Sequence, residues 1–222
     1  MMGHAGMAAL AVRYLRPAGP PAPEARPPDP MPRPVLRAVR ADEQPPPAPG
    51  ELRRVLGRFA SGVTVITAPG AGDEPPAGFA CQSFASLSLD PPLVVFMVGR
   101  TSTTWPRIAR AGVFCVNILG AGQSTLCKAF AVSSAQAADK FAGVRHSPAP
   151  VTGSPLLAGV PAWVDCEIHA VHTGGDHLIV VGRVEALGAE ESEGRKGNEN
   201  ADEDGPLIFH RSTFGTFTAF DA

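Results

Sequence analysis

Short apolar runs separated by glycine, proline and aspartate fill the chain from Glu51 to its end. Several of these runs are rich in β-branched residues, which favour strands over helices. The expected strands are residues 63–67, 93–98, 113–119, 163–172, 177–187 and 206–210. Only residues 104–111 and 123–131 have the character of helices. Many short strands with few helices predict a mainly β fold, an antiparallel barrel.

Two of the expected strands flank residues 173–176, Thr-Gly-Gly-Asp. This sequence predicts a hairpin, because the tight type I′ and II′ turns need residues with positive φ, which glycine adopts readily. A two-residue turn at Gly174 and Gly175 would place His172 opposite His177 at the rim of the barrel, where a ligand could reach both. The alternative is a turn histidine that only hydrogen-bonds locally. Since His169 would face the other way, a third metal ligand is lacking, and we expect no metal site.

Proline divides the chain into two regions. Residues 1–50 hold 13 of the 24 prolines, which cannot donate to ladders or sit inside helices. We therefore expect a disordered tail over residues 1–50 and a folded domain over 51–222. Within the domain, residues 188–205 carry seven acidic and two basic residues and should form an exposed loop.

Composition excludes several functional classes. A net charge of −2 gives no field that would collect nucleic acid, and no apolar run is long enough to cross a membrane. The four cysteines are too widely spaced for a metal or redox pair, so we expect reduced thiols in a cytoplasmic protein. No phosphate-binding loop, dinucleotide fingerprint or nucleophile elbow is present. Hydrolase and acyl-transfer chemistry therefore have little support.

The segment 81–89 is the first that could carry a site. Treated as one strand, it alternates between two faces. One face would carry Cys81, Ser83, Ala85, Leu87 and Leu89, and the other Gln82, Phe84, Ser86 and Ser88. The second face, small and rich in hydroxyls, could lie against a flat polar ring and hydrogen-bond its carbonyls and nitrogens. An edge strand with solvated serines explains the same pattern.

The start of the helix expected at 104–111 is the second such segment. Thr104 suits the N-cap and Pro106 the first turn, so free backbone N–H groups would lie beside the hydroxyls of Ser102 and Thr103. This arrangement suits a phosphate, which the positive end of the helix dipole would stabilise. Alternatively, these hydroxyls only cap the helix.

Taken in order, six segments resemble the flavin reductases of two-component, flavin-diffusible monooxygenases. They are residues 59–67, 78–92, 100–105, 114–119, 139–143 and 174–177, and the resemblance spans 51–217. It implies an antiparallel split β-barrel of Greek-key type with a few short helices, assembled as a homodimer. Many relatives carry Thr and Asn where this chain has Ala80 and Gln82. Its Cys-Gln-Ser sequence resembles reductases that serve aromatic-ring hydroxylases.

The resemblance also implies the site. The residues around Cys81, with Ser88, would hold the flavin ring and ribityl chain. Ser102 and Thr104, in the segment 102–104 that we call the hydroxyl segment, would lie near its phosphate, and His177 would lie near the nicotinamide. The implied cofactor-binding residues are Val63, Thr64, Ala80, Cys81, Gln82, Ser83, Ser88, Ser102, Thr103, Thr104 and His177. As the catalytic candidate, His177 would orient the dinucleotide and need not act as a base.

The expected function is an NAD(P)H:flavin oxidoreductase that passes reduced FMN or FAD by diffusion to a separate monooxygenase. NADH is favoured over NADPH, because no basic cluster is evident for a 2′-phosphate. A non-enzymatic flavin sensor or carrier is the alternative from another class. An oxidase of a pyridoxine phosphate is a third possibility within the same fold.

Overall fold

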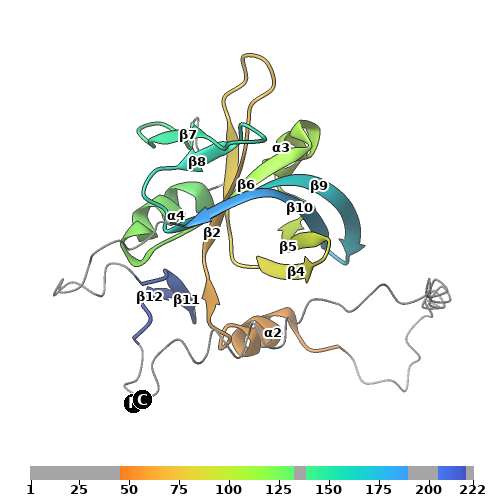
Figure 1. Cartoon of the computed structure of the whole chain (residues 1–222). Coiled ribbons are helices and arrows are strands. Elements are labelled where there is room, and N and C mark those ends of the chain that lie inside the picture. The colour runs from red at the N-terminus through yellow and green to blue at the C-terminus, as the bar shows by residue number, and fades with distance from the viewer. Residues whose placement is uncertain (1–45, 133–138, 190–204, 219–222) are drawn as a thin grey trace, which may run out of the picture. The chain divides into compact units, whose positions relative to one another are not determined.

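The computed structural model describes residues 46–132, 139–189 and 205–218 (Figure 1). The chain divides into Met1–Pro46 and Pro47–Ala222, and every element described below belongs to the second unit. Most of the expected tail and most of the expected acidic loop lie outside the described residues. The expected domain boundary falls inside helix α2 (Pro49–Leu56), which begins one residue before the end of the predicted tail.

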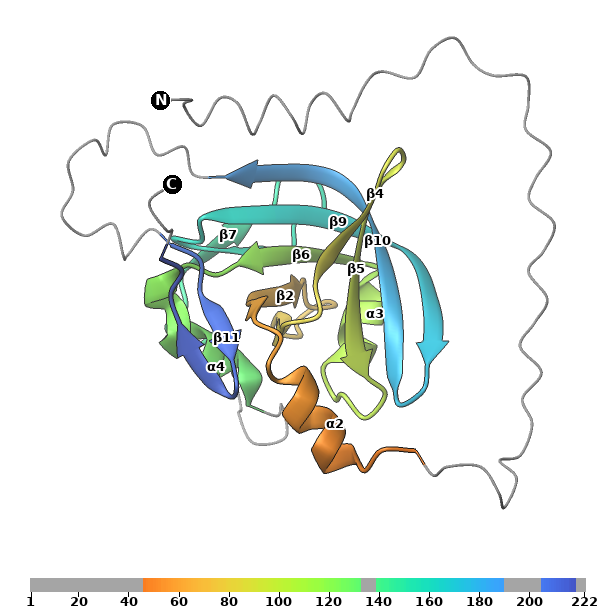
Figure 2. The same ribbon diagram turned by 90° about the horizontal axis from the view of Figure 1, so that it is seen from below.

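An antiparallel seven-stranded sheet in the order β3-β2-β6-β9-β10-β5-β4 is the largest element of this unit. Its strands are β2 (Thr64–Ala68), β3 (Ala77–Cys81), β4 (Ala85–Leu89), β5 (Pro92–Gly99), β6 (Val113–Ile118), β9 (Ala162–Gly174) and β10 (His177–Ala189). The edge strands β3 and β4 are separated in the chain by residues 82–84 alone. The sheet therefore curls until its edges approach each other (Figure 2). The predicted mainly β, antiparallel fold is confirmed.

Shorter elements complete the structure. The sheet β1-β11-β12 joins Ser61–Gly62, Ile208–His210 and Thr213–Gly215, and a two-stranded sheet joins β7 (His146–Pro148) to β8 (Pro155–Leu157). The two expected helices appear as α3 (Trp105–Ala111) and α4 (Ser124–Ala131), the latter preceded by the 3-10 turn η1 (Ala121–Gln123). No helix in the described ranges is both long and apolar enough to cross a bilayer.

An aromatic cluster fills the interior beneath the long hairpin of β9 and β10. Phe96 is fully buried, and its ring centroid lies 5.2 Å from that of Phe114 and 6.2 Å from that of Trp105. Gly182 of β10 faces this cluster. A Cβ atom at Gly182 would lie 2.4 Å from Cζ of Phe114, so the ring occupies the space that any side chain there would need.

A buried amide attaches the β7–β8 hairpin to the large sheet. Asn117 of β6 donates from Nδ2 to the carbonyl oxygen of Val65, at 3.2 Å, and to that of Pro155, at 3.3 Å. Its Oδ1 accepts a hydrogen bond from the backbone N–H of Leu157 at 2.8 Å. One side chain on β6 therefore connects β2 and β8, and it is fully buried.

The expectation of one continuous strand over residues 81–89 is wrong. The chain leaves β3 at Cys81, bends through residues 82–84 and starts β4 at Ala85. In the bend, Oγ of Ser83 accepts from the backbone N–H of Met97 at 2.8 Å and donates to the carbonyl of Met97 at 3.0 Å. The Ser83 side chain thus takes the place of backbone groups in hydrogen bonding to β5, where the chain crosses from one edge of the sheet to the other. The alternation of side chains between two faces therefore does not continue through residues 82–84.

The expected β9–β10 hairpin is confirmed, but its register differs from the prediction. Gly174 pairs with His177, and His172 pairs with Ile179, so the turn consists of Gly175 and Asp176. Gly175 supplies the positive φ, at 72°. His172 is therefore not opposite His177. The position opposite His177 on its other side, in β5, is Gly99.

Candidate functional site

A cavity of about 600 Å³ brings most of the predicted site together. Nine of the eleven predicted residues line it: Val63, Ala80, Cys81, Gln82, Ser83, Ser102, Thr103, Thr104 and His177. Val63 lies between β1 and β2, and the other eight come from the end of β3, the bend after it, the segment between β5 and α3, and the start of β10. The facing wall includes residues of α4, β11 and β12. Figure 2 shows α4 and β11 on one side of β2, and β5 and β10 on the other.

The structure does not bring Thr64 and Ser88 to the cavity wall. Thr64 is buried, and its Oγ1 donates to the carbonyl of Cys81 at 3.0 Å. It therefore holds the end of β3 in place without lining the cavity. Ser88 lies in β4 opposite Leu93, beyond the bend at residues 82–84. The bend interrupts the face on which Ser88 was expected to continue from Gln82.

The hydroxyl segment forms the start of α3. Thr104 occupies the N-cap position as expected, yet the capping side chain belongs to Ser102, whose Oγ accepts from the backbone N–H of Trp105 at 3.2 Å. Ser102 is itself held by a backbone hydrogen bond from its N–H to the carbonyl of Gly99, at 2.9 Å. The segment is therefore folded into a turn whose hydroxyls reach the cavity from one side.

His177 stands at the cavity rim beside a position without a side chain. Its Nδ1 donates to Oδ1 of Asp176 at 2.8 Å, and the side chain of His177 is about half exposed. This hydrogen bond lowers the pKa of the Asp176 carboxyl below its ordinary value. Across the strands, a Cβ atom at Gly99 would lie 4.0 Å from Nε2 of His177 and 3.9 Å from Oγ1 of Thr101. The glycine keeps this space open beside the imidazole.

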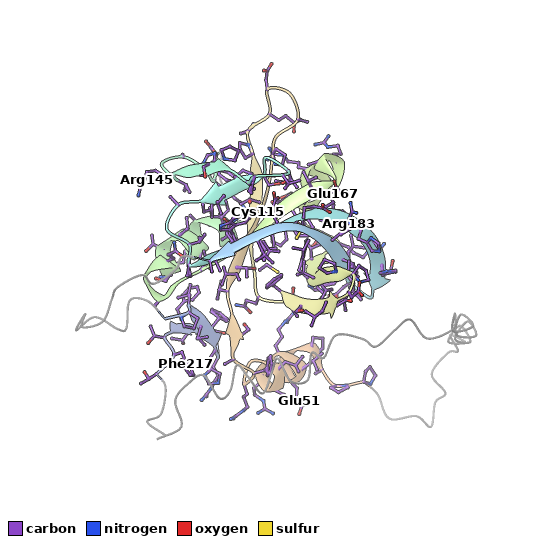
Figure 3. All side chains as sticks on the ribbon, in the orientation of Figure 1. Glu51, Cys115, Arg145, Glu167, Arg183 and Phe217 are labelled. Carbon is purple, nitrogen blue, oxygen red and sulfur yellow. The ribbon has the colours of Figure 1, made fainter. Side chains whose placement is uncertain are left out.

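The four cysteines are free and buried, as Figure 3 shows for Cys115 in the interior. Cys81 lines the cavity, but burial raises the pKa of its thiol, so the reactive thiolate is disfavoured. Burial also raises the pKa of Cys115, to about 12. Within the described ranges, no three His, Cys, Asp or Glu side chains gather to hold a metal ion. The residues around the cavity are thus suited to bind and orient a ligand.

Several residues of the cavity wall were not among those predicted from the sequence. Among them are Phe79, Gly99, Phe130, Lys140, Phe209 and Phe214. Lys140 could have been predicted, because it belongs to residues 139–143, one of the six segments that carry the family resemblance. Phe209 and Phe214 come from strands far along the chain, and only the fold brings them to the cavity that the end of β3 also lines.

The model of the flavin reductase like domain matches residues 56–218, most of the chain. The chain belongs to the flavin reductase like family. It is 45% identical over 166 residues to the reductase subunit HsaB of a flavin-dependent monooxygenase from Rhodococcus jostii, covering 75% of this chain and 76% of that one. It is 43% identical over 171 residues to a flavin reductase of Pseudomonas putida, covering 77% and 91%.

A solved structure of this family gives the same result for the fold. The NADH:FAD oxidoreductase SgcE6 of Streptomyces globisporus, solved with NAD and FAD fragments, superposes with a TM-score of 0.66 at 34% identity. The match covers 76% of this chain and 92% of that one. The family and split-barrel fold predicted from six short segments are therefore confirmed.

Proposed function

We propose that this chain is an NADH-dependent flavin reductase that supplies reduced FMN or FAD to a separate monooxygenase. One observation carries the proposal: a single cavity collects the β3 end, the hydroxyl segment and His177, which the family resemblance assigns to flavin ring, flavin phosphate and nicotinamide. The relatives support the proposal, since one is a monooxygenase reductase subunit and another was solved with NAD and FAD fragments.

The residues present fit a flavin nucleotide. Ligand pockets typically measure about 300–1,000 Å³, and this cavity has about 600 Å³. Its wall offers the hydroxyls and amide that a polar ring and a phosphate require, at Gln82, Ser102 and Thr103. Gly99 leaves room beside His177 where a larger residue would fill the rim.

When bound, the flavin accepts a hydride from the reduced nicotinamide, and this chemistry belongs to the two cofactors. The protein positions the reactants. The end of β3, held by Thr64 and by the Ser83 hydrogen bonds to Met97, gives the ring a fixed surface. The turn at Ser102 would hold its hydroxyls beside a bound phosphate. His177, oriented by Asp176, would hold the dinucleotide at the rim. No protein nucleophile is required, and burial raises the pKa of the Cys81 thiol, which disfavours the reactive thiolate.

The proposed function is tested by following NADH oxidation by absorbance with and without added FMN or FAD. Turnover that depends on the added flavin is the expected result. A protein that retains flavin through purification but oxidises no NADH would be the sensor or carrier instead. Measuring all four pairings of FMN or FAD with NADH or NADPH identifies the preferred couple, for which we expect NADH.

Replacing His177 by alanine should raise the KM for NADH about tenfold, the equivalent of one lost hydrogen bond to a charged group. The dissociation constant for flavin should change much less, because His177 is assigned to the nicotinamide end. Steady-state kinetics with NADH varied and flavin saturating provide the measurement. His172→Ala is the matched control, since His172 lies on the same hairpin and does not line the cavity. Unchanged NADH kinetics in the His177 variant would remove this residue from the site.

We further propose a cytoplasmic homodimer. The apolar side chains at the N-terminal end of the second unit support a second copy as their cover, because they are half exposed or more: Leu52, Val55, Leu56 and Phe59. Helix α2 has no buried residue in the single chain. Four cysteines kept as free thiols support a reducing compartment.

A further inference from the structure

The loop between β2 and β3, residues 69–76, is tightly closed. A Cβ atom at Gly70 would lie 1.8 Å from the carbonyl oxygen of Glu74, so the two ends of the loop approach each other closely. Pro75 and Pro76 then lead directly into β3. Because proline fixes φ, this approach to the strand is stiff. Figure 1 shows the loop above β2, next to α3.

Arg107 of α3 joins this loop to the helix. Its Nη2 donates to the carbonyl oxygens of Pro75 and Pro76, the latter at 3.4 Å. Its Nε lies 3.7 Å from Oε2 of Glu74, and Nη2 of Arg110 lies 3.6 Å from the same oxygen. The side chain of Arg107 is 27% exposed and that of Arg110 63%. Arg107 is therefore the better anchored of the two.

The two elements that Arg107 joins both lead to the cavity. β3 runs from the loop to Cys81 on the cavity wall, about 13 Å away at about 3.3 Å per residue. α3 begins at Trp105, immediately after the hydroxyl segment, which lines the same cavity. Arg107 itself does not line the cavity. Its geometric effect on the cavity is therefore carried by β3 and α3.

The packing of α3 leaves such an effect room to act. The helix has seven residues, and its buried side chains are Trp105 and Ile108. These two are three residues apart and so share one face of the helix. Apolar contact is non-directional and holds the helix on the sheet without fixing its position along it. The planar guanidinium of Arg107 adds donors of fixed direction.

Resting on the proposed function, we propose that Arg107 is a positioning residue for the flavin nucleotide. By joining α3 to the start of β3, it sets the separation between the end of β3, assigned to the flavin ring, and the hydroxyl segment, assigned to the phosphate. A ligand that contacts both places is sensitive to this separation. A ligand that contacts the ring surface alone is not.

The test compares Arg107→Met with the wild-type chain by fluorescence titration of riboflavin and FMN, which share the ring and ribityl chain and differ in the phosphate. Methionine keeps an unbranched side chain and removes every donor. The variant should bind FMN about tenfold more weakly, the equivalent of one lost hydrogen bond to a charged group. Riboflavin should bind both proteins nearly equally. A role in stability alone would weaken both ligands alike or lower only the unfolding temperature.

Two further variants separate position from charge. Arg110→Met removes a positive charge from an exposed position on the same helix and should leave both affinities unchanged. Arg107→Lys keeps the charge without the planar fork of donors, so most of the loss for FMN should remain. The lysine variant also carries the test if Arg107→Met does not fold. Full FMN binding in Arg107→Lys, equal losses for the two ligands, or no loss for FMN would overturn the proposal.

Flavin-dependent NADH oxidation by the wild-type chain tests the proposed function separately. Because the titrations need no turnover, a wild-type chain that binds FMN more tightly than riboflavin but oxidises no NADH would contradict the proposed function alone. Wild-type turnover together with unchanged FMN binding in Arg107→Met would contradict only the role of Arg107.

Discussion

Replacing Gly182 by valine should lower the free energy of unfolding by about 3 kcal/mol, the upper part of the range for overpacked cores. The cause is steric. A Cβ atom at this position of β10 would lie 2.4 Å from Cζ of Phe114 and 3.3 Å from Cβ of Cys166. Phe114 cannot move aside easily, since its ring packs edge-on against the buried ring of Phe96. Chemical denaturation followed by tryptophan fluorescence measures the change.

Gly215→Val is the matched control for Gly182→Val. Gly215 lies in β12, and a Cβ there would have no atom within 4 Å. The same increase in side-chain volume should therefore cost little. Similar losses of stability in the two variants would show that the effect is a general cost of removing a strand glycine and that contact with Phe114 does not cause it.

Replacing Gly99 by leucine should reduce kcat/KM for flavin-dependent NADH oxidation about 100-fold, the loss expected from displacing reacting groups by about 1 Å. Gly99 pairs with His177 and lines the cavity, so the added side chain would occupy the space between the imidazole and Thr101. The fold should persist, because the position is open on that side. Steady-state kinetics together with the unfolding temperature measure both effects.

Gly99→Ala gives the graded comparison. Its Cβ would make only ordinary contacts, at 3.9 Å to Oγ1 of Thr101 and 4.0 Å to Nε2 of His177. Most of the activity should therefore remain. An alanine variant as inactive as the leucine variant, with an intact fold, would mean that backbone freedom at position 99 matters and that open space does not.

Strand composition and turn residues made the large sheet predictable. The β-branched runs became β2 and β5, and the Gly-Gly-Asp sequence became the β9–β10 turn. The register of this hairpin was harder to predict. A turn at Gly174 and Gly175 and a turn at Gly175 and Asp176 both contain glycine, and only the structure shows that the second one forms. The strands of two or three residues, such as β1 and β7, are too short to leave a periodic signal.

The candidate site was predictable where local chemistry marks it. Ser102, Thr103 and His177 stand at turns rich in polar residues, and the structure places them on one cavity. Ser88 was assigned to the site by the family resemblance, and the alternation that placed it on the same face as Gln82 is interrupted by the bend after Cys81. The bend depends on Met97, fourteen residues away in the chain from Ser83, and local sequence cannot reveal such a pairing. The same holds for Phe209 and Phe214.

The contacts of Asn117 bear on how far this domain can be shortened. Deleting the β7–β8 hairpin would remove the carbonyl of Pro155 and the N–H of Leu157, and would strip a buried amide of partners on two sides. An unsatisfied buried polar group costs about 1–3 kcal/mol. A minimal reductase made for engineering must therefore keep this small surface hairpin, or replace Asn117 by an apolar residue in the same step.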